Sequence, residues 1–189
     1  MVKQRPLPAK LEAVLIRLAK SRKLNLTQAA KLPYLVDVVA QHVLGRSITG
    51  GTHQAWKYGV VTAEAWRCLN REDQSSALRV EPVRWSEEKR VRILEDVEVA
   101  ELTPEEEEIV DAVAGVFGDV WATELGAMTK RMNPQIRTWG TNETADVGPD
   151  AYERMSRDYQ EMAEAAARCT LDGLRRSSEP VADVEEALA

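Results

Sequence analysis

Apolar residues recur at helical spacing in several separate stretches of this chain. Between residues 8 and 22 they fall three or four positions apart, with lysine and arginine between them, which predicts a first amphipathic helix. A second stretch, 27–44, predicts a longer helix with Thr27 as its N-terminal cap and Gly45 directly after its end. Pro33 should kink this helix or delay its start, because proline lacks the N–H that a helix interior requires.

The middle of the chain changes from this helical spacing to other patterns. Residues 45–59 carry four glycines and no sustained apolar period, which predicts an ordered loop with short extended pieces. A short helix should follow at 62–69. Residues 78–84 and 91–97 then alternate with a period of two, so we predict a small β-hairpin connected by a turn at 85–89.

The clearest helix start in the sequence is at Thr103. Thr103 can cap the helix, Pro104 suits its first turn, and Glu106 completes a capping box. The apolar spacing predicts a helix over 103–118, and a further helix is expected over 121–130.

The last part of the chain reads as an appendage. Residues 139–149 have the composition of a linker. An amphipathic helix should start at Asp150, with apolar residues at alternating spacings of three and four: Tyr152, Met155, Tyr159, Met162, Ala166 and Cys169. The predicted fold class is therefore mainly α, a compact helical domain with a small β-hairpin and an accessory C-terminal amphipathic helix.

This organisation predicts a domain at 1–140 that folds by itself. Residues 141–189 would then form a linker, the amphipathic helix and an acidic C-terminal tail, and would supply contacts to a partner. The alternative is that the helix packs on the domain, since an isolated helix of this length is only marginally stable in water.

The charge is unevenly distributed around a net value of −6. Residues 1–59 contain ten Lys or Arg and two acids, whereas residues 93–129 contain eleven acids and no Lys or Arg. A basic face could bind nucleic acid or an acidic partner. The interpretation that we favour is that the basic and acidic segments face each other within one fold, because no Lys/Arg-rich block occurs.

The residues that usually carry chemistry are sparse. Cys68 and Cys169 form no metal or disulfide motif, and His42 and His53 lack further ligands at metal spacing. The sequence contains no nucleophile, phosphate-binding or dinucleotide motif. We therefore expect a protein that is not an enzyme and has no metal or cofactor. No signal peptide or membrane span fits the sequence, so a cytoplasmic location without membrane contact is expected.

Two segments resemble the Panacea domain family of SocA-like antitoxins and phage-associated proteins. Residues 31–37, KLPYLVD, resemble the KLLYLAD helix of that family, and residues 45–61, which contain GRSITG and AWKYGVV, resemble its GRPLTG and AWKYGPV stretch. Near the end of the similarity, Lys130 stands where the family often has His, and Trp139 comes later than the usual Pro-Trp.

This resemblance implies an antitoxin of a toxin–antitoxin system. Such a protein would neutralise a cognate protein toxin, encoded next to it, by direct stoichiometric binding. One alternative is an adaptor that delivers a toxin or another client to a protease. Another is a nucleic-acid-binding regulator of its own operon.

The candidate partner-binding residues come from two regions. Trp56 and Tyr58 alternate, so in an extended piece they would share one face while Lys57 points the other way, and both rings could equally belong to the core. Arg46 could pair with Asp37 or with a carboxylate of the partner. The C-terminal helix adds Tyr152, Met155, Tyr159 and Met162, because tyrosine and methionine suit adaptable contact surfaces.

Overall fold

The computed structural model describes residues 7–70, 77–84, 89–94 and 100–178, with side chains up to residue 168. Over these residues the chain is mainly helical and has two small antiparallel hairpins, which confirms the predicted fold class and adds a second hairpin. The elements in chain order are α1 (Ala9–Ser21), α2 (Leu26–Leu44), β1 (His53–Trp56), β2 (Gly59–Thr62), α3 (Ala63–Asn70), β3 (Leu78–Pro82), β4 (Lys89–Ile93), α4 (Pro104–Phe117), α5 (Ala122–Arg131), α6 (Pro149–Glu153) and α7 (Arg157–Ser178).

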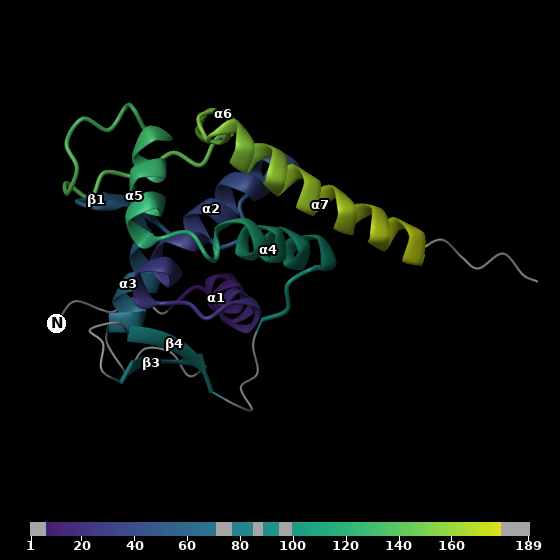
Figure 1. The fold of residues 1–189 in the computed structure, drawn as a ribbon, viewed down its shortest axis with the longest axis horizontal. Coiled ribbons are helices and arrows are strands. Elements are labelled where there is room, and N and C mark those ends of the chain that lie inside the picture. Colours follow the sequence, from purple (N-terminus) through teal and green to yellow (C-terminus); the bar gives the residue numbers. More distant parts are fainter. Residues whose placement is uncertain (1–6, 71–76, 85–88, 95–99, 179–189) are drawn as a thin grey trace, which may run out of the picture.

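Helix α2 forms the centre of the molecule. Every residue from Gln28 to Ala40 is buried. The helices α1, α3, α4, α5 and α6 and the strand β2 all pack against it (Figure 1). A helix that is covered on all sides draws its stability from tertiary packing, which explains why this stretch is apolar nearly all round.

The start of α2 differs from the prediction. Asn25, and not Thr27, caps the helix: its side chain accepts a hydrogen bond from the Gln28 N–H at 2.8 Å, and the Gln28 side chain accepts one from the Asn25 N–H at 3.2 Å. Pro33 does not delay the start, because it lies inside the helix. The burial of this helix on all sides outweighs the cost of about 3 kcal/mol that an interior proline carries. Gly45 ends the helix with φ 69°, as expected.

The start of α4 was predicted correctly. Thr103 caps the helix and forms the reciprocal capping box with Glu106, and Pro104 is its first residue. Ile109, Val110 and Val113 are buried on its inner face. These are local signals, and the fold leaves them unchanged.

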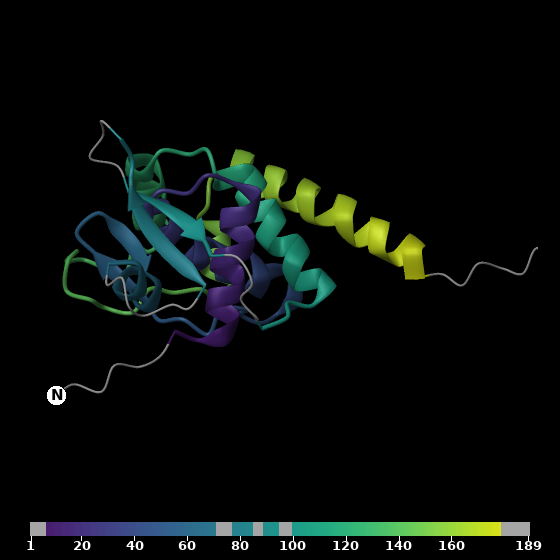
Figure 2. The ribbon, with the colours of Figure 1, turned by 90° about the horizontal axis from the view of Figure 1, so that it is seen from below.

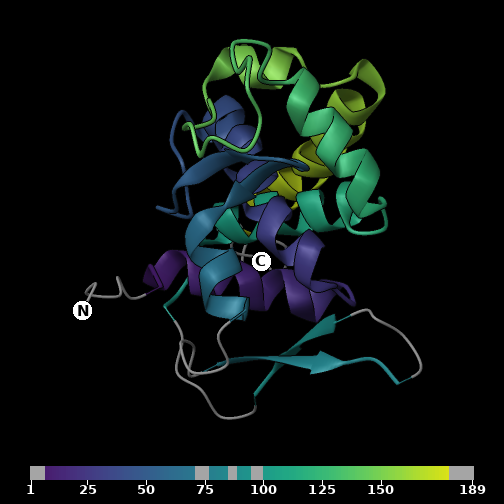
Figure 3. The same cartoon turned by 90° about the vertical axis from the view of Figure 1, so that its left-hand side faces the viewer.

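The two hairpins lie on different sides of the helical body (Figure 3). The predicted hairpin is confirmed by β3 and β4, and β4 also joins the segment before α2 through a hydrogen bond from the Val91 N–H to the Leu24 carbonyl at 3.0 Å. Residues 85–88 of its predicted turn and 95–97 of its predicted second strand lie outside the described residues, and Lys89 belongs to β4 and not to the turn. The second hairpin, β1–β2, arises within the predicted glycine loop and just after it, so the expected extended pieces are real.

The C-terminal region contains two helices where one was predicted. Gly148 caps α6, whose first residue is Pro149, and the helical run breaks at Arg154–Ser156 before α7 begins. The break occurs because α6 packs on α2, whereas α7 runs along α4 (Figures 1 and 2). Up to residue 168, the buried residues of α7 are Ala163 and Ala167, so the buried stripe is displaced from Met162 and Ala166. The side chain of Cys169, also predicted for this stripe, lies outside the described ones.

The predicted linker is part of the fold. Residues 143–145 lie antiparallel to β1: the Ala55 N–H donates to the Glu143 carbonyl at 2.8 Å, and the Ala145 N–H donates to the His53 carbonyl at 2.9 Å. Ala145 is buried as well. A segment with the composition of a linker thus lines the edge of a hairpin, because backbone hydrogen bonds need no particular side chains.

Candidate functional site

The most exposed aromatic residue of the family-like segments lies at the tip of the β1–β2 hairpin. The pairing of Trp56 with Gly59 leaves Lys57 and Tyr58 as a two-residue turn, and Gly59 has φ 103°. Tyr58 is 72% exposed, and the Lys57 ammonium lies 5.3 Å from the centre of the Tyr58 ring. The core interpretation of Tyr58 is therefore wrong.

Trp56 and Tyr58 also do not share one face of an extended piece, because the chain turns between them. Trp56 is half-buried at the end of β1. Its ring packs edge-to-face with the Trp66 ring, with 5.5 Å between the ring centres, and its Nε1 donates a hydrogen bond to the Gln54 side chain at 3.3 Å. Trp56 thus anchors the hairpin to α3 and leaves the turn residues to face outward.

The turn rests directly on α5 through two glycines. A Cβ at Gly126 would lie 2.4 Å from the Tyr58 carbonyl oxygen, and a Cβ at Gly59 would lie 2.8 Å from Gly126 Cα. Thr129 completes the joint by accepting a hydrogen bond from the Val60 N–H at 3.1 Å. Such close backbone approach fixes the position of the turn.

Gly126→Ala should therefore displace the hairpin tip. The added methyl group meets a backbone carbonyl that cannot rotate away, so we expect a loss of about 1–3 kcal/mol in unfolding free energy together with shifted amide signals for residues 57–60. Gly115→Ala on α4 is the matched control, because a Cβ there has nothing within 4 Å. The control should be neutral or stabilising by up to about 1 kcal/mol. Equal melting curves and unmoved tip signals in the two variants would contradict this account.

Lys31 supports the turn from the inside. This residue is 1% exposed, and its ammonium donates to the Tyr58 carbonyl at 2.6 Å and to the Val60 carbonyl at 3.3 Å. Burial, with the nearby charge of Lys130, lowers the pKa of Lys31 to about 8. The lysine of the KLPYLVD segment thus holds the tip and does not face a partner.

The depressed pKa of Lys31 predicts a pH-dependent stability. Between pH 8 and 10.5 the unfolded chain keeps a proton on Lys31 that the folded chain has lost, so the unfolding free energy should rise with pH in this window. Over this pH window the unfolding free energy of the wild-type protein should increase by up to about 3 kcal/mol more than that of Lys31→Met. Denaturant unfolding of both proteins at pH 7.5 and pH 10.5 measures this increase. If the unfolding free energies of the two proteins change equally with pH, the depressed pKa of Lys31 is contradicted.

Asp37, from the same segment, organises the glycine loop. Its carboxylate accepts hydrogen bonds from the N–H groups of Ile48 and Thr49 at 2.7 and 2.9 Å, and its second oxygen lies 2.8 Å from His53 Nε2 and accepts a hydrogen bond from the Thr49 hydroxyl. Burial would raise the pKa of Asp37, but the hydrogen bonds and charge of His53 and the bonds from Thr49 outweigh it and lower the pKa.

This cluster places an acid, a histidine and a hydroxyl in line, because His53 Nδ1 also lies 3.0 Å from the Thr62 hydroxyl. Both threonines are 0% exposed and His53 is 4% exposed, so no substrate reaches any of them. A catalytic triad needs an accessible nucleophile. The cluster is therefore suited to fixing the loop before β1.

Tyr34, the third polar residue of this helix face, ties α2 to the segment after α5. Its hydroxyl donates to the Asp146 carbonyl at 2.9 Å and accepts a hydrogen bond from the Asn133 side chain at 2.8 Å. Burial raises the pKa of Tyr34 well above its usual value. Lys31, Tyr34 and Asp37 recur every three residues, so one face of α2 holds the hairpin, the glycine loop and residue 146 together.

The predicted pair of Arg46 with Asp37 does not form. Arg46 forms an ion pair of 2.8 Å with Glu106 of α4, which also binds Lys10 at 2.6 Å. Burial would raise the pKa of Glu106, but Lys10, the Thr103 N–H and Arg46 together lower it to about 2. The difference arises because Asp37 points inward to His53, whereas Arg46 follows the Gly45 cap on the outside of α2.

The basic N-terminal part faces the acidic helix α4, as the favoured interpretation of the charge pattern predicts. Arg17 pairs with Asp111 at 2.6 Å and with Glu107 at 3.2 Å, and Arg22 lies 3.7 Å from Asp119. These cations form ion pairs within the fold. They give no support for a nucleic-acid site in the first third of the chain.

The four C-terminal candidates have different surroundings. Tyr152 and Met155 are buried, and the Tyr152 ring stacks on His42 with 3.8 Å between ring centres. Tyr159 is half-buried and donates to Glu124 at 2.8 Å, whereas Met162 is 51% exposed. Tyr152 and Met155 therefore belong to the core, and only the other two reach the surface.

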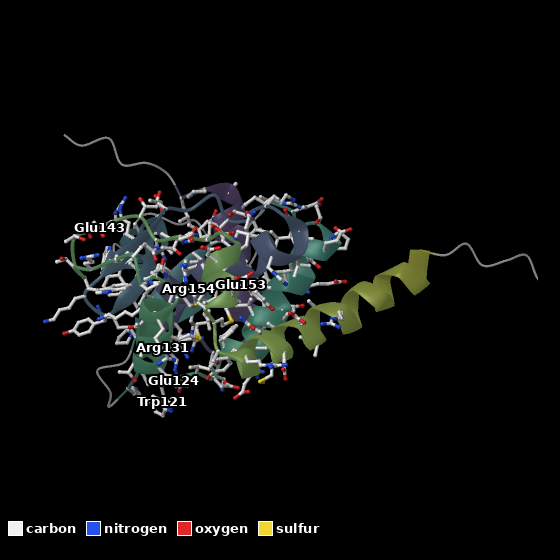
Figure 4. All side chains as sticks on the ribbon, turned by 90° about the horizontal axis from the view of Figure 1, so that it is seen from above. Trp121, Glu124, Arg131, Glu143, Glu153 and Arg154 are labelled. Atoms are coloured by element: carbon white, nitrogen blue, oxygen red, sulfur yellow. The ribbon has the colours of Figure 1, made fainter. Side chains whose placement is uncertain are left out.

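One exposed aromatic residue, Trp121, was not among the predicted candidates. It precedes α5 at the cap position, where a polar residue is common, and it is 80% exposed. Figure 4 shows Trp121 and Glu124 at the start of α5, at the opposite edge of the molecule from Glu143. Trp121 lies five residues before Gly126, the α5 glycine that contacts the turn.

Within the described residues, no group of three His, Cys, Asp or Glu side chains could hold a metal ion. No helix among them combines the length and the apolar character that crossing a bilayer needs. Cys68 is buried without a disulfide, and burial raises the pKa of its thiol to about 11.

The fold and site define a mainly helical domain in which a buried polar face of one central helix holds an exposed, rigid hairpin tip. The family model described as antitoxin SocA-like, Panacea domain, matches residues 30–134, which is more than half of the chain. The chain therefore belongs to this family. No curated protein and no solved structure matches this chain.

Proposed function

We propose that this chain is the antitoxin of a toxin–antitoxin system and neutralises a cognate protein toxin by direct stoichiometric binding, without catalysis, in the cytoplasm. The family match supports the antitoxin class. The observation that carries the binding mechanism is the exposed Lys57–Tyr58 turn, held in place by Lys31 and by the two glycines of the α5 joint. A rigid aromatic side chain loses little entropy on binding and is a frequent anchor of protein interfaces.

The gene next to this one provides the first test. Expressed alone it should stop growth, and growth should return when this chain is produced with it. Purification of either protein should then recover both at a fixed ratio. Rescue without a complex and with an unchanged toxin level would contradict direct binding, while a fall in toxin level would indicate an adaptor for a protease instead.

Tyr58→Ala should separate binding from folding. Because the ring is exposed, the melting temperature should stay close to that of the wild-type protein, whereas the affinity for the toxin should fall by about 2 kcal/mol or more. Trp56→Ala is the contrasting variant, since it removes a half-buried ring packed on Trp66 and should lower the stability. Normal affinity of Tyr58→Ala would remove the tip from the interface.

A further inference from the structure

The hairpin tip is part of a larger surface made by three segments. Gly140 lies beside the turn, because a Cβ there would be 3.9 Å from the Lys57 N atom. Lys130 follows Gly126 by one helical turn on α5, and its ammonium lies 5.2 Å from the centre of the Trp139 ring. Lys57, Tyr58, Lys130 and Trp139 therefore form one continuous surface, which we call the hairpin patch.

The cations of the hairpin patch differ in their surroundings from those that face α4. Lys10, Arg17 and Arg46 all bind carboxylates of α4. Within the described part of the chain, by contrast, Lys57 and Lys130 form no ion pair and lie over aromatic rings. Arg137, two residues before Trp139, is exposed and likewise forms no ion pair among the described residues. The protein carries a net charge of −6, yet this patch presents positive charge that its own carboxylates do not neutralise.

The backbone of the hairpin patch is also preorganised for binding. The Tyr58 and Val60 carbonyls are bound by Lys31, the Val60 N–H is bound by Thr129, and the turn contacts the backbone of α5. Little backbone entropy remains to be lost when a partner docks. A small cationic surface of this kind can therefore contribute both rate and specificity to association.

The arrangement of the cations favours a protein over a nucleic acid. Each lysine lies over an aromatic ring, and this occupies ring faces on which a base would otherwise stack. Nucleic-acid surfaces usually extend as a stripe of basic residues, whereas the loop beside this patch carries an exposed Glu143. A carboxylate can approach each ammonium from its outer side while the ring remains in place.

We propose that the hairpin patch binds a carboxylate-rich segment of the partner protein, with Lys57 and Lys130 contacting the carboxylates and Tyr58 and Trp139 packing beside them. This inference deepens the proposed antitoxin function and rests on it for the identity of the partner. The chemistry of the patch can be measured without that partner.

The test is a titration of the full-length protein with a blocked peptide of 20 glutamates, next to oligodeoxythymidylate of 20 nucleotides and a lysine peptide. The indole N–H signal of Trp139 should move on addition of the glutamate peptide and should stay in place on addition of the lysine peptide. We expect saturable binding at low salt that weakens as salt rises. Lys57→Glu/Lys130→Glu should raise the Kd at least about tenfold.

The control is Lys20→Glu/Lys23→Glu, which makes the same change in net charge at exposed positions near the end of α1. This variant should bind within about twofold of wild type, because exposed charges farther away than the Debye length are screened. An equal loss in both variants would show unspecific attraction and overturn the inference. So would the absence of saturable binding, or tighter binding of the oligonucleotide through the same lysines.

The growth assay separates this inference from the proposed function. If Lys57→Glu/Lys130→Glu still neutralises the toxin as well as wild type, the antitoxin function stands and the hairpin patch is not its binding surface. If the neighbouring gene is not toxic, the proposed function fails, while the peptide titration still decides what the patch recognises.

Discussion

A chain that ends after Gly140 should lose cooperative unfolding. The cut removes six residues that are at most 5% exposed in the full chain: Ala145, Ala151, Tyr152, Met155, Ala163 and Ala167. It also exposes the faces of α2 and α4 that α6 and α7 cover. Loss of even one large buried side chain costs about 2–5 kcal/mol, so their combined loss should exceed a typical total stability of about 5–15 kcal/mol. Thermal melting followed by circular dichroism measures the result.

A chain that ends after Arg168 is the matched control. It keeps all the buried residues named above and should melt close to the full-length temperature. The pattern of composition predicts a domain boundary near residue 140, and a Gly140 truncation with a sharp, near-normal melting transition would support that boundary. The hydrogen bonds of residues 143–146 with β1, Tyr34 and Asn133 give the physical reason to expect the opposite.

Asp37→Ala should be the most damaging single substitution considered for this protein. It removes the acceptor for two backbone N–H groups and for Thr49, and leaves His53 buried without its carboxylate. Each buried donor left without an acceptor costs about 1–3 kcal/mol, so the total loss should be about 3–5 kcal/mol, which corresponds to a fall in Tm of roughly 10 °C in a protein of this size. Asp119→Ala, whose side chain is 83% exposed, is the control and should change the stability by less than about 0.5 kcal/mol.

The same carboxylate gives the prediction a pH dependence. The pKa of Asp37 is lower in the folded protein than in the unfolded chain, so its stabilisation is complete above the unfolded value of about 3.9 and disappears as the pH falls through the folded value. The difference in unfolding free energy between wild type and Asp37→Ala should therefore shrink below about pH 4. A difference that grows with acidification would show that the pKa is shifted the other way.

Local signals in the sequence correctly predicted the start of α4 and the end of α2, although at the start of α2 the local cap Asn25 was missed in favour of Thr27. Thr103, Pro104 and Glu106 fix the start of α4, and Gly45 ends α2, because caps involve groups only a few positions apart. Pro33 shows the limit of such signals. Its local preference against a helix interior is overcome by the packing of α2 against helices and strands from the whole domain, which no short window of sequence contains.

The candidate site shows the same division. Lys57 and Tyr58 of the AWKYG stretch were predicted as partner-binding residues, and both lie on the surface. Their direction could not be predicted, because it depends on the pairing of Trp56 with Gly59 and on Gly126 some seventy residues later. Lys130 and Trp139 join them only through the fold, and Asp37 meets His53 across a loop that has no repeating pattern.

The closed edges of the β1–β2 hairpin limit how any partner can recognise it. Residues 143–145 occupy the outer edge of β1. On the opposite edge the N–H and carbonyl of Val60, which an incoming strand would need, are bound by Thr129 and Lys31. Recognition by strand addition, which relies on main-chain hydrogen bonds common to all sequences, is therefore blocked at these positions. The choice of partner must depend on a few side chains at the turn, so substitutions there could redirect the protein to a different partner without rebuilding the fold beneath.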